Sequence, residues 1–253
     1  MLETGKEAAP APARYRSIFL SDVHLGSPRA QAELLLDFLA RTQAEYLYLV
    51  GDIVDDGRQP RHEHWPEAHR AVLDVVRRKA GEGTRVDCLP SNHDGCAEAV
   101  WGAAARELVV ASELEHRTAD GRRLWVVHGD AFDAAVLGRR WLSRLGDAGA
   151  RALEHVGRAC ERVGRGRNGT LGLRLKELGK RWLGYTRRFE RTALRAARAR
   201  RVDGVICGHV HSGASRTVEG LYYGNGGDWV GSASALVEHA DGRFRLLRWA
   251  RAA

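Results

Sequence analysis

Short apolar runs alternate with longer amphipathic segments in the first half of the chain. The runs over residues 17–20 and 46–50 have the length of buried strands, whereas apolar positions recur at helical spacing over 28–41 and 67–80. This alternation predicts parallel strands with helices packed on the faces of their sheet.

The pattern changes in the second half. Asp120-Gly121 and Asp241-Gly242 each lie between two apolar runs, which is a strong signal for a β-hairpin. Antiparallel strands should therefore join the parallel ones or form a second sheet. We expect an α/β fold, a two-sheet sandwich flanked by helices.

Strand signals are absent from Asp133 to Arg201, between the two Asp-Gly pairs, where the composition turns to Arg, Leu, Ala and Gly. We interpret residues of about 134–201 as a helical cap inserted into a single domain that covers 15–253, preceded by a disordered tail over 1–14. One apolar stripe follows helical spacing in the cap: Leu171, Leu175, Leu178, Trp182, Tyr185 and Phe189. The stripe either packs onto the domain, as such faces usually do, or touches lipid or an acyl chain.

Composition narrows the class of protein. A chain of 253 residues can bury a sizeable core as one domain. We expect the first residues to be a frayed tail rather than a signal peptide, and we find no apolar run long enough to span a membrane. Its four cysteines are scattered without a close pair, so neither disulfides nor a thiolate zinc site are expected, and a reducing cytoplasm fits best.

The formal charge is +8, and arginine is concentrated between Arg139 and Arg201. This asymmetry predicts a polyanionic partner. Charge alone does not decide whether that partner is a phosphate ester, a nucleic acid or an anionic lipid surface. The chain carries no specific nucleic-acid-binding motif.

Polar motifs follow the strand-like runs. Side chains with oxygen or nitrogen donors directly follow each of five runs: 17–20, 46–50, 124–127, 205–207 and the weaker run 86–89. Because open α/β sheets bind ligands at the carboxyl ends of their strands, we expect these donors to meet at one site. The candidate metal ligands are Asp22, His24, Asp52, Asn92, His128, His209 and His211.

Seven such donors suit two adjacent divalent ions. Carboxylate, imidazole and amide ligands without thiolate favour Mn²⁺, Fe²⁺, Zn²⁺ or Mg²⁺. Asp52 is the natural bridge between the ions, since a carboxylate has two oxygens. We assign Asp22, His24 and His211 to one ion, and Asn92, His128 and His209 to the other. A pair of ions activates water and clamps the oxygens of a phosphoryl group, so the predicted reaction is phosphoester hydrolysis without a protein nucleophile.

Two neighbours of Asn92 are catalytic candidates. His93 could stabilise developing charge or protonate the leaving oxygen, and Asp94 could orient the His93 imidazole.

The ordered set of motifs resembles the calcineurin-like metallophosphoesterase superfamily, whose pattern is D-x-H, G-D, G-N-H-D, H and G-H-x-H. The resemblance covers residues 18–211 and implies the same seven ligands, two divalent ions and His93 as the catalytic histidine. Among the metals we expect Mn²⁺ first. Ser91 stands where the family usually has glycine, a residue suited to positive φ.

Three further stretches, at residues 21–26, 128–133 and 223–230, look like those of the UDP-2,3-diacylglucosamine pyrophosphohydrolase group. That resemblance implies cleavage of a nucleotide-linked lipid to UMP and 2,3-diacylglucosamine 1-phosphate in lipid A biosynthesis, with peripheral contact to the anionic inner membrane. Asp133, Lys176 and Asn225 are the candidate substrate contacts. For Lys176 a solvated cation, and for Asn225 a turn residue, are the alternatives. The best-known branch of the group has arginine at the position of His93.

Two rival functions stay open. One is a metallophosphodiesterase or nuclease acting on another nucleotide substrate, which the arginine-rich charge favours. The other is a non-catalytic scaffold that binds a protein partner, for which lost ligands would be typical; this chain retains all seven.

Overall fold

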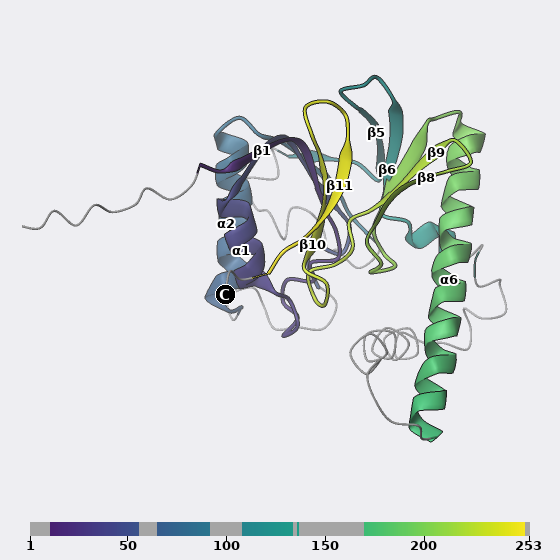
Figure 1. Cartoon of the computed structure of the whole chain (residues 1–253). Helices are drawn as coiled ribbons and strands as arrows, with labels where there is room; N and C mark the ends of the chain where they lie inside the picture. The colour runs from purple at the N-terminus through teal and green to yellow at the C-terminus, as the bar shows by residue number, and fades with distance from the viewer. Residues whose placement is uncertain (1–10, 56–64, 92–107, 134–135, 137–169, 251–253) are drawn as a thin grey trace, which may run out of the picture.

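The computed structural model describes residues 11–55, 65–91, 108–133, 136 and 170–250, with side chains given from Leu183 onward in the last of these segments. Two β-sheets lie face to face, with helices on both outer sides (Figure 1). The layers are α1 and α2, a six-stranded sheet, a five-stranded sheet, and α6. This two-sheet α/β sandwich confirms the predicted fold class.

The six-stranded sheet has the order β11-β10-β1-β2-β3-β4. Its bounds are β1 Ala13–Leu20, β2 Thr42–Val50, β3 Arg85–Leu89, β4 Val109–Val110, β10 Ser234–Glu238 and β11 Phe244–Arg248. Strands β1 to β4 are parallel, while β10 and β11 form the hairpin predicted around Asp241-Gly242. β1 begins two residues inside the expected tail, because the Ala13 amide donates to the Arg41 carbonyl and Ala13 pairs with Thr42.

The five-stranded sheet has the order β5-β6-β7-β9-β8. Its bounds are β5 Glu113–Arg117, β6 Arg123–Val127, β7 Gly204–Cys207, β8 Ala214–Val218 and β9 Leu221–Asn225. β5 and β6 form the predicted hairpin at Asp120-Gly121, and β6, β7 and β9 are parallel. The β8–β9 hairpin was not predicted; it turns at Glu219 and Gly220, both with positive φ.

Three α-helices are described: α1 Ala32–Ala40, α2 Glu67–Gly81 and α6 Thr170–Arg200. α1 and α2 match the predicted helical segments, and α1 buries Leu35, Phe38 and Leu39 along one face. α6 continues through Gly172, Gly179 and Gly184 and extends well beyond the sheets at one end (Figure 1). None of the helices in the described part of the chain is long and apolar enough to cross a membrane.

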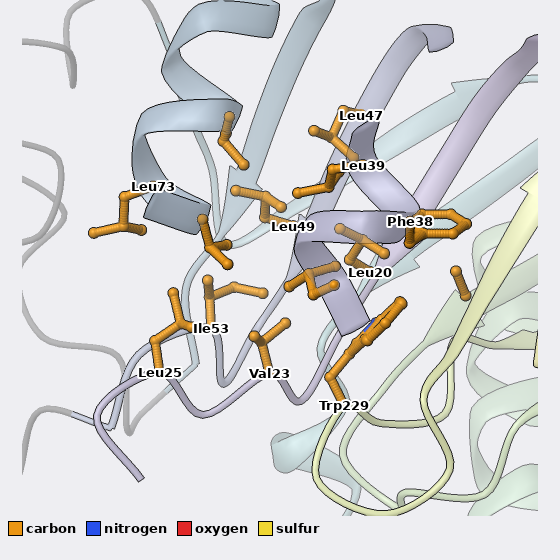
Figure 2. Packing of buried hydrophobic residues seen from close by; sticks show 14 of the residues in the cluster. Leu20, Val23, Leu25, Phe38, Leu39, Leu47, Leu49, Ile53, Leu73 and Trp229 are labelled. Carbon is orange, nitrogen blue, oxygen red and sulfur yellow. The ribbon is translucent and has the colours of Figure 1, made fainter. Parts of the chain in front are cut away.

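Strand β2 shows how the core is divided. Leu47 and Leu49 point to the cluster beneath α1 and α2, whereas Tyr48 and Val50 point to the cluster between the sheets. Successive side chains of a strand face opposite ways, so one continuous apolar run serves both clusters. Figure 2 shows the helix-side cluster, where Trp229 lies below Phe38; the Trp229 ring centroid is 5.4 Å from that of Phe38.

The parallel strands end on the same side of the sandwich. β1, β2 and β3 in one sheet and β6 and β7 in the other run up to the predicted motifs. The backbone amide of His209, after β7, donates to Asp22 Oδ2, after β1, over 2.9 Å. This bond joins the carboxyl edges of the two sheets and places the site between them.

Candidate metal centre

Two groups of predicted ligands come together at this shared edge. Asp22, His24 and His211 form one triad, and Asp52, His128 and His209 form the other; within each triad the ligand atoms all lie within 4.8 Å of one another. The first triad holds the three side chains assigned to one ion, and the second holds two of those assigned to the other ion together with Asp52, the expected bridge. Asn92, the seventh candidate, and the catalytic candidates His93 and Asp94 lie outside the described residues.

Asp52 belongs to the second triad and also faces the first. Its Oδ2 is 3.7 Å from His24 Nε2 in the first triad, and its Oδ1 is 3.6 Å from His128 Nε2 in the second. Both distances are too long for hydrogen bonds. They are close to the separation of about 3 to 3.5 Å expected for two atoms that each bind one ion at about 2.1 Å. Each oxygen of Asp52 therefore faces a different triad, as a bridging carboxylate must.

Buried polar atoms in both triads lack hydrogen bonds. Asp22 Oδ1, His24 Nε2 and His128 Nε2 are enclosed, yet none of them makes a hydrogen bond with any residue in the described segments. Buried polar atoms are normally satisfied, so several such atoms aimed at one place need a partner of another kind. A pair of divalent cations meets that need, and the donor set fits them.

The backbone is strained at five of the six described candidates. Positive φ angles of 47° to 68° occur at Asp22, His24, Asp52, His209 and His211. For residues other than glycine such angles cost about 1 to 3 kcal/mol each and cluster at functional sites. The strain lets the chain turn sharply after each strand, which brings Asp22 and His24, two residues apart, into the same triad.

Glycines beside the candidates leave the room that the site needs. A Cβ atom on Gly51 would lie 2.2 Å from His128 Nδ1, and one on Gly208 would lie 2.6 Å from Asp22 Oδ2. Gly51 also has a φ of +70°. The small residue in each Gly-Asp and Gly-His pair is therefore a requirement of close packing between the two sheets.

Hydrogen bonds orient the imidazoles of the second triad. His128 Nδ1 donates to the Val50 carbonyl over 3.0 Å, which leaves Nε2 as the lone-pair atom facing Asp52. His209 Nε2 donates to Asp133 Oδ2 over 2.8 Å, which leaves Nδ1 as the available ligand atom. A metal-binding histidine usually donates its other N–H in this way.

Asp133 was predicted as a substrate contact, and the structure uses both of its oxygens. One accepts the His209 bond, and the other accepts a 2.5 Å hydrogen bond from the Tyr185 hydroxyl on α6. Sequence reasoning missed this link, since the spacing of the three residues gives no signal for it. Contact of Asp133 with substrate stays a prediction.

Asn225 and Lys176, the other two predicted substrate contacts, lie in different parts of the structure. Asn225 is fully buried; its Nδ2 donates to the Gly208 carbonyl over 2.8 Å, and its Oδ1 accepts from the Gly227 amide over 2.9 Å. It thus supports the loop that carries His209, in line with the turn-residue alternative. Lys176 lies within α6, in the part whose side chains are outside the description.

Ser91 has a role that the resemblance to the family did not imply. It is absent from the residues with positive φ, so replacing the family glycine carries no backbone strain. Its hydroxyl donates to Asp52 Oδ1 and accepts from the Asp52 amide over 3.3 Å. Ser91 therefore helps to fix the carboxylate that lies between the triads.

The protonation equilibria reflect the crowding of charge. Burial, and then the charge of Asp52, holds the pKa of Asp22 well above its usual range. Burial lowers the pKa of His128. Burial also acts to lower the pKa of His24 and His209, but the carboxylates around them outweigh it and raise each pKa to about 9. Without cations, the site is therefore an unfavourable cluster of buried charge.

A family model described as calcineurin-like phosphoesterase matches residues 15–213, which include every described candidate ligand. The chain belongs to this family. It is accordingly a metal-dependent phosphoester hydrolase, and the two triads of its structure are candidate sites for the two ions that the family uses. No curated protein matches the chain.

Several solved structures are similar in fold. A Vps29 single mutant from Entamoeba histolytica is 13% identical, with a TM-score of 0.46 over 92% of this chain and 97% of the other. An archaeal phosphodiesterase is 12% identical, with a TM-score of 0.45 over 92% and 98%. The phosphoesterase Yfce from E. coli is 16% identical, with a TM-score of 0.43 over the same shares.

Proposed function

We propose that Asp22, His24 and His211 hold one divalent ion, that His128 and His209 hold the second together with Asn92, and that Asp52 bridges them. The observation that carries this proposal is the position of Asp52, with one oxygen facing each triad. When bound, two such ions lower the pKa of a water molecule and neutralise the phosphoryl oxygens. Mn²⁺ is the metal we expect first, with Fe²⁺, Zn²⁺ and Mg²⁺ as alternatives.

The side chains of the site bind and orient the substrate and supply the proton. Asp22, Asp52 and His128 are buried and fix the charge and shape of the floor, while the side chains of His24 and His209 are 19% and 18% exposed. The substrate therefore enters over these two partly exposed imidazoles. In this proposal His93, oriented by Asp94, donates a proton to the leaving oxygen.

For the substrate we propose a nucleotide-linked lipid, UDP-2,3-diacylglucosamine, hydrolysed at its pyrophosphate to UMP and 2,3-diacylglucosamine 1-phosphate. The support is the set of sequence stretches that resemble that enzyme group, together with the character of α6. Leu183 is 56% exposed there, and the following turns expose Arg187, Arg188, Arg191 and Arg195. Exposed apolar and cationic groups on one helix suit a lipid with a pyrophosphate head.

The proposal also concerns where the enzyme acts. The four arginines form no ion pair with any carboxylate in the described segments. They are available to an anionic lipid surface, where each basic residue contributes about 1 kcal/mol of attraction. The enzyme would then meet its substrate at the cytoplasmic face of the inner membrane.

The test is product analysis with purified protein, Mn²⁺ or Mg²⁺, and UDP-2,3-diacylglucosamine. We expect UMP from the wild type and from Asp74→Ala, which removes an exposed carboxylate on α2, and none from Asp52→Ala. Absence of UMP alongside metal-dependent cleavage of bis(p-nitrophenyl) phosphate would retain the metal site and reject the lipid substrate. Cleavage of single-stranded DNA or RNA instead would favour the nuclease alternative.

A further inference from the structure

Helix α6 reaches the metal centre through one of its turns. Tyr185 and Phe189 are four residues apart and share a face of the helix. Phe189 is fully buried, and its ring centroid is 5.9 Å from that of His209. Gly129, next to His128, makes this approach possible, since a Cβ there would lie 2.8 Å from Phe189 Cζ.

The same face carries a hydrogen-bond chain to the metal centre. The Tyr185 hydroxyl donates to Asp133 Oδ1 over 2.5 Å, and His209 Nε2 donates to Asp133 Oδ2 over 2.8 Å. Asp133 directly follows the short 3-10 helix η3 (Asp130–Phe132), so its backbone is held by the strand end that carries His128. A rigid carboxylate thus lies between the imidazole and the helix.

An ion pair holds α6 in place one turn further on. Glu190, only 8% exposed, accepts two hydrogen bonds from the guanidinium of Arg216 on β8, one of them from Nε over 2.9 Å. Such bidentate pairs are geometrically specific. α6 is therefore anchored to the sheet beside the point where Tyr185 meets Asp133, while its N-terminal turns extend beyond the sheets (Figure 1).

We propose that Asp133 and Tyr185 are positioning residues that couple the docking of α6 to metal binding at His209. The inference rests on the proposed metal centre and adds a control element to it. By accepting the proton of Nε2, Asp133 keeps the lone pair on Nδ1, and Tyr185 fixes the carboxylate in that orientation. The cap helix is thereby part of the metal site although none of its described residues is a ligand.

Coupling of this kind is reciprocal. If docking of α6 improves the affinity of the second site for metal, then metal binding must stabilise the docked helix by the same factor. The amides of residues 186–191 should therefore exchange more slowly once metal is bound. A substrate contact at Asp133 gives no such effect in the absence of substrate.

The first experiment is a titration of the metal-free full chain with Mn²⁺, followed by calorimetry or by the electron paramagnetic resonance of free Mn²⁺. We expect two ions in the wild type. In Asp133→Asn an amide N–H can face Nε2 and favour the tautomer with its proton on Nδ1, so binding of one ion should weaken by about 10- to 100-fold. In Tyr185→Phe the loss should be about 3- to 10-fold, the value of one hydrogen bond.

Tyr222→Phe is the matched control. It removes a tyrosine hydroxyl that bonds to Ser215 over 2.9 Å, away from the triads, and should bind two ions with wild-type affinity. If Asp133→Asn does not fold, Tyr185→Phe decides the question. Fewer than two ions in the wild type overturns the proposed function and this inference together, whereas unchanged affinity in a folded Tyr185→Phe and Asp133→Asn overturns the inference alone.

Hydrogen exchange supplies the second readout. In the wild type and in Tyr222→Phe, saturating Mn²⁺ should slow exchange in residues 186–191. In Asp133→Asn the slowing should be absent or reduced, even at Mn²⁺ concentrations that saturate both sites. Equal protection in all three proteins contradicts the coupling.

Discussion

Replacing Asp22 with asparagine should stabilise the metal-free protein. The side chain of Asp22 is fully buried, and burial together with the charge of Asp52 raises its pKa. Its ionised form therefore reduces the free energy of unfolding at neutral pH. Asparagine has the same shape and can still accept the 2.9 Å bond from the His209 amide through its carbonyl oxygen.

The expected gain is about 1 to 2 kcal/mol, typical of relieving a destabilised functional site. For a chain of this size that corresponds to a rise in Tm of about 2 to 8 °C. Bound metal reverses the order. An ion at 100 times its Kd adds about 2.7 kcal/mol to the wild type, and the variant, which lacks a charged ligand, should gain little of this.

The assay is thermal unfolding of both proteins, first with a chelator and then with Mn²⁺. We expect the variant to have the higher Tm with chelator and the wild type to have the higher Tm with metal. With chelator, the gap should narrow as the pH is lowered, because protonated Asp22 no longer carries a buried charge. A lower Tm for the variant with chelator, at neutral pH, would refute the reasoning.

Two more substitutions test neighbouring parts of the structure. Gly51→Ala places a Cβ 2.2 Å from His128 Nδ1. We therefore expect a Tm lower by roughly 4 to 12 °C and the loss of one bound Mn²⁺ in a titration. Two ions bound with wild-type affinity would contradict the close packing. His69 is buried and accepts a 2.9 Å hydrogen bond from the Gly26 amide, and burial lowers its pKa. The unfolded chain therefore binds a proton at His69 more readily than the folded chain does. The stability that neutral His69 contributes is present above the unfolded pKa and is lost as the pH falls. His69→Gln should therefore flatten the decline in the free energy of unfolding between about pH 7 and 5.

The sequence predicted the framework well because strand ends carry their own signals. A short apolar run and the polar motif that follows it are both local signals, so the parallel strands could be recognised, and an Asp-Gly pair between two apolar runs marked each of the two hairpins. The β8–β9 hairpin was missed because its turn, Glu219-Gly220, lacks the usual Asn or Asp before the glycine. Val109–Val110 was too short to stand out as a strand.

The triads were predictable as a set of donors, but their geometry was not. Aspartate and histidine adopt positive φ more readily than most residues, but which of them do so follows from how the two sheets meet. The bond between Tyr185 and Asp133 joins positions 52 apart, and the hydroxyl of Ser91 finds Asp52 across 39 positions. Such contacts depend on tertiary packing, so they emerge only when the chain is folded.

A crystal structure of the protein grown with Mn²⁺, with anomalous diffraction collected at the manganese edge, tests the central claim most directly. The account predicts two anomalous peaks about 3.5 to 4 Å apart, one contacting Asp22, His24 and His211, the other His128 and His209, with Asp52 touching both. A single peak, or two peaks that do not share Asp52, would contradict it.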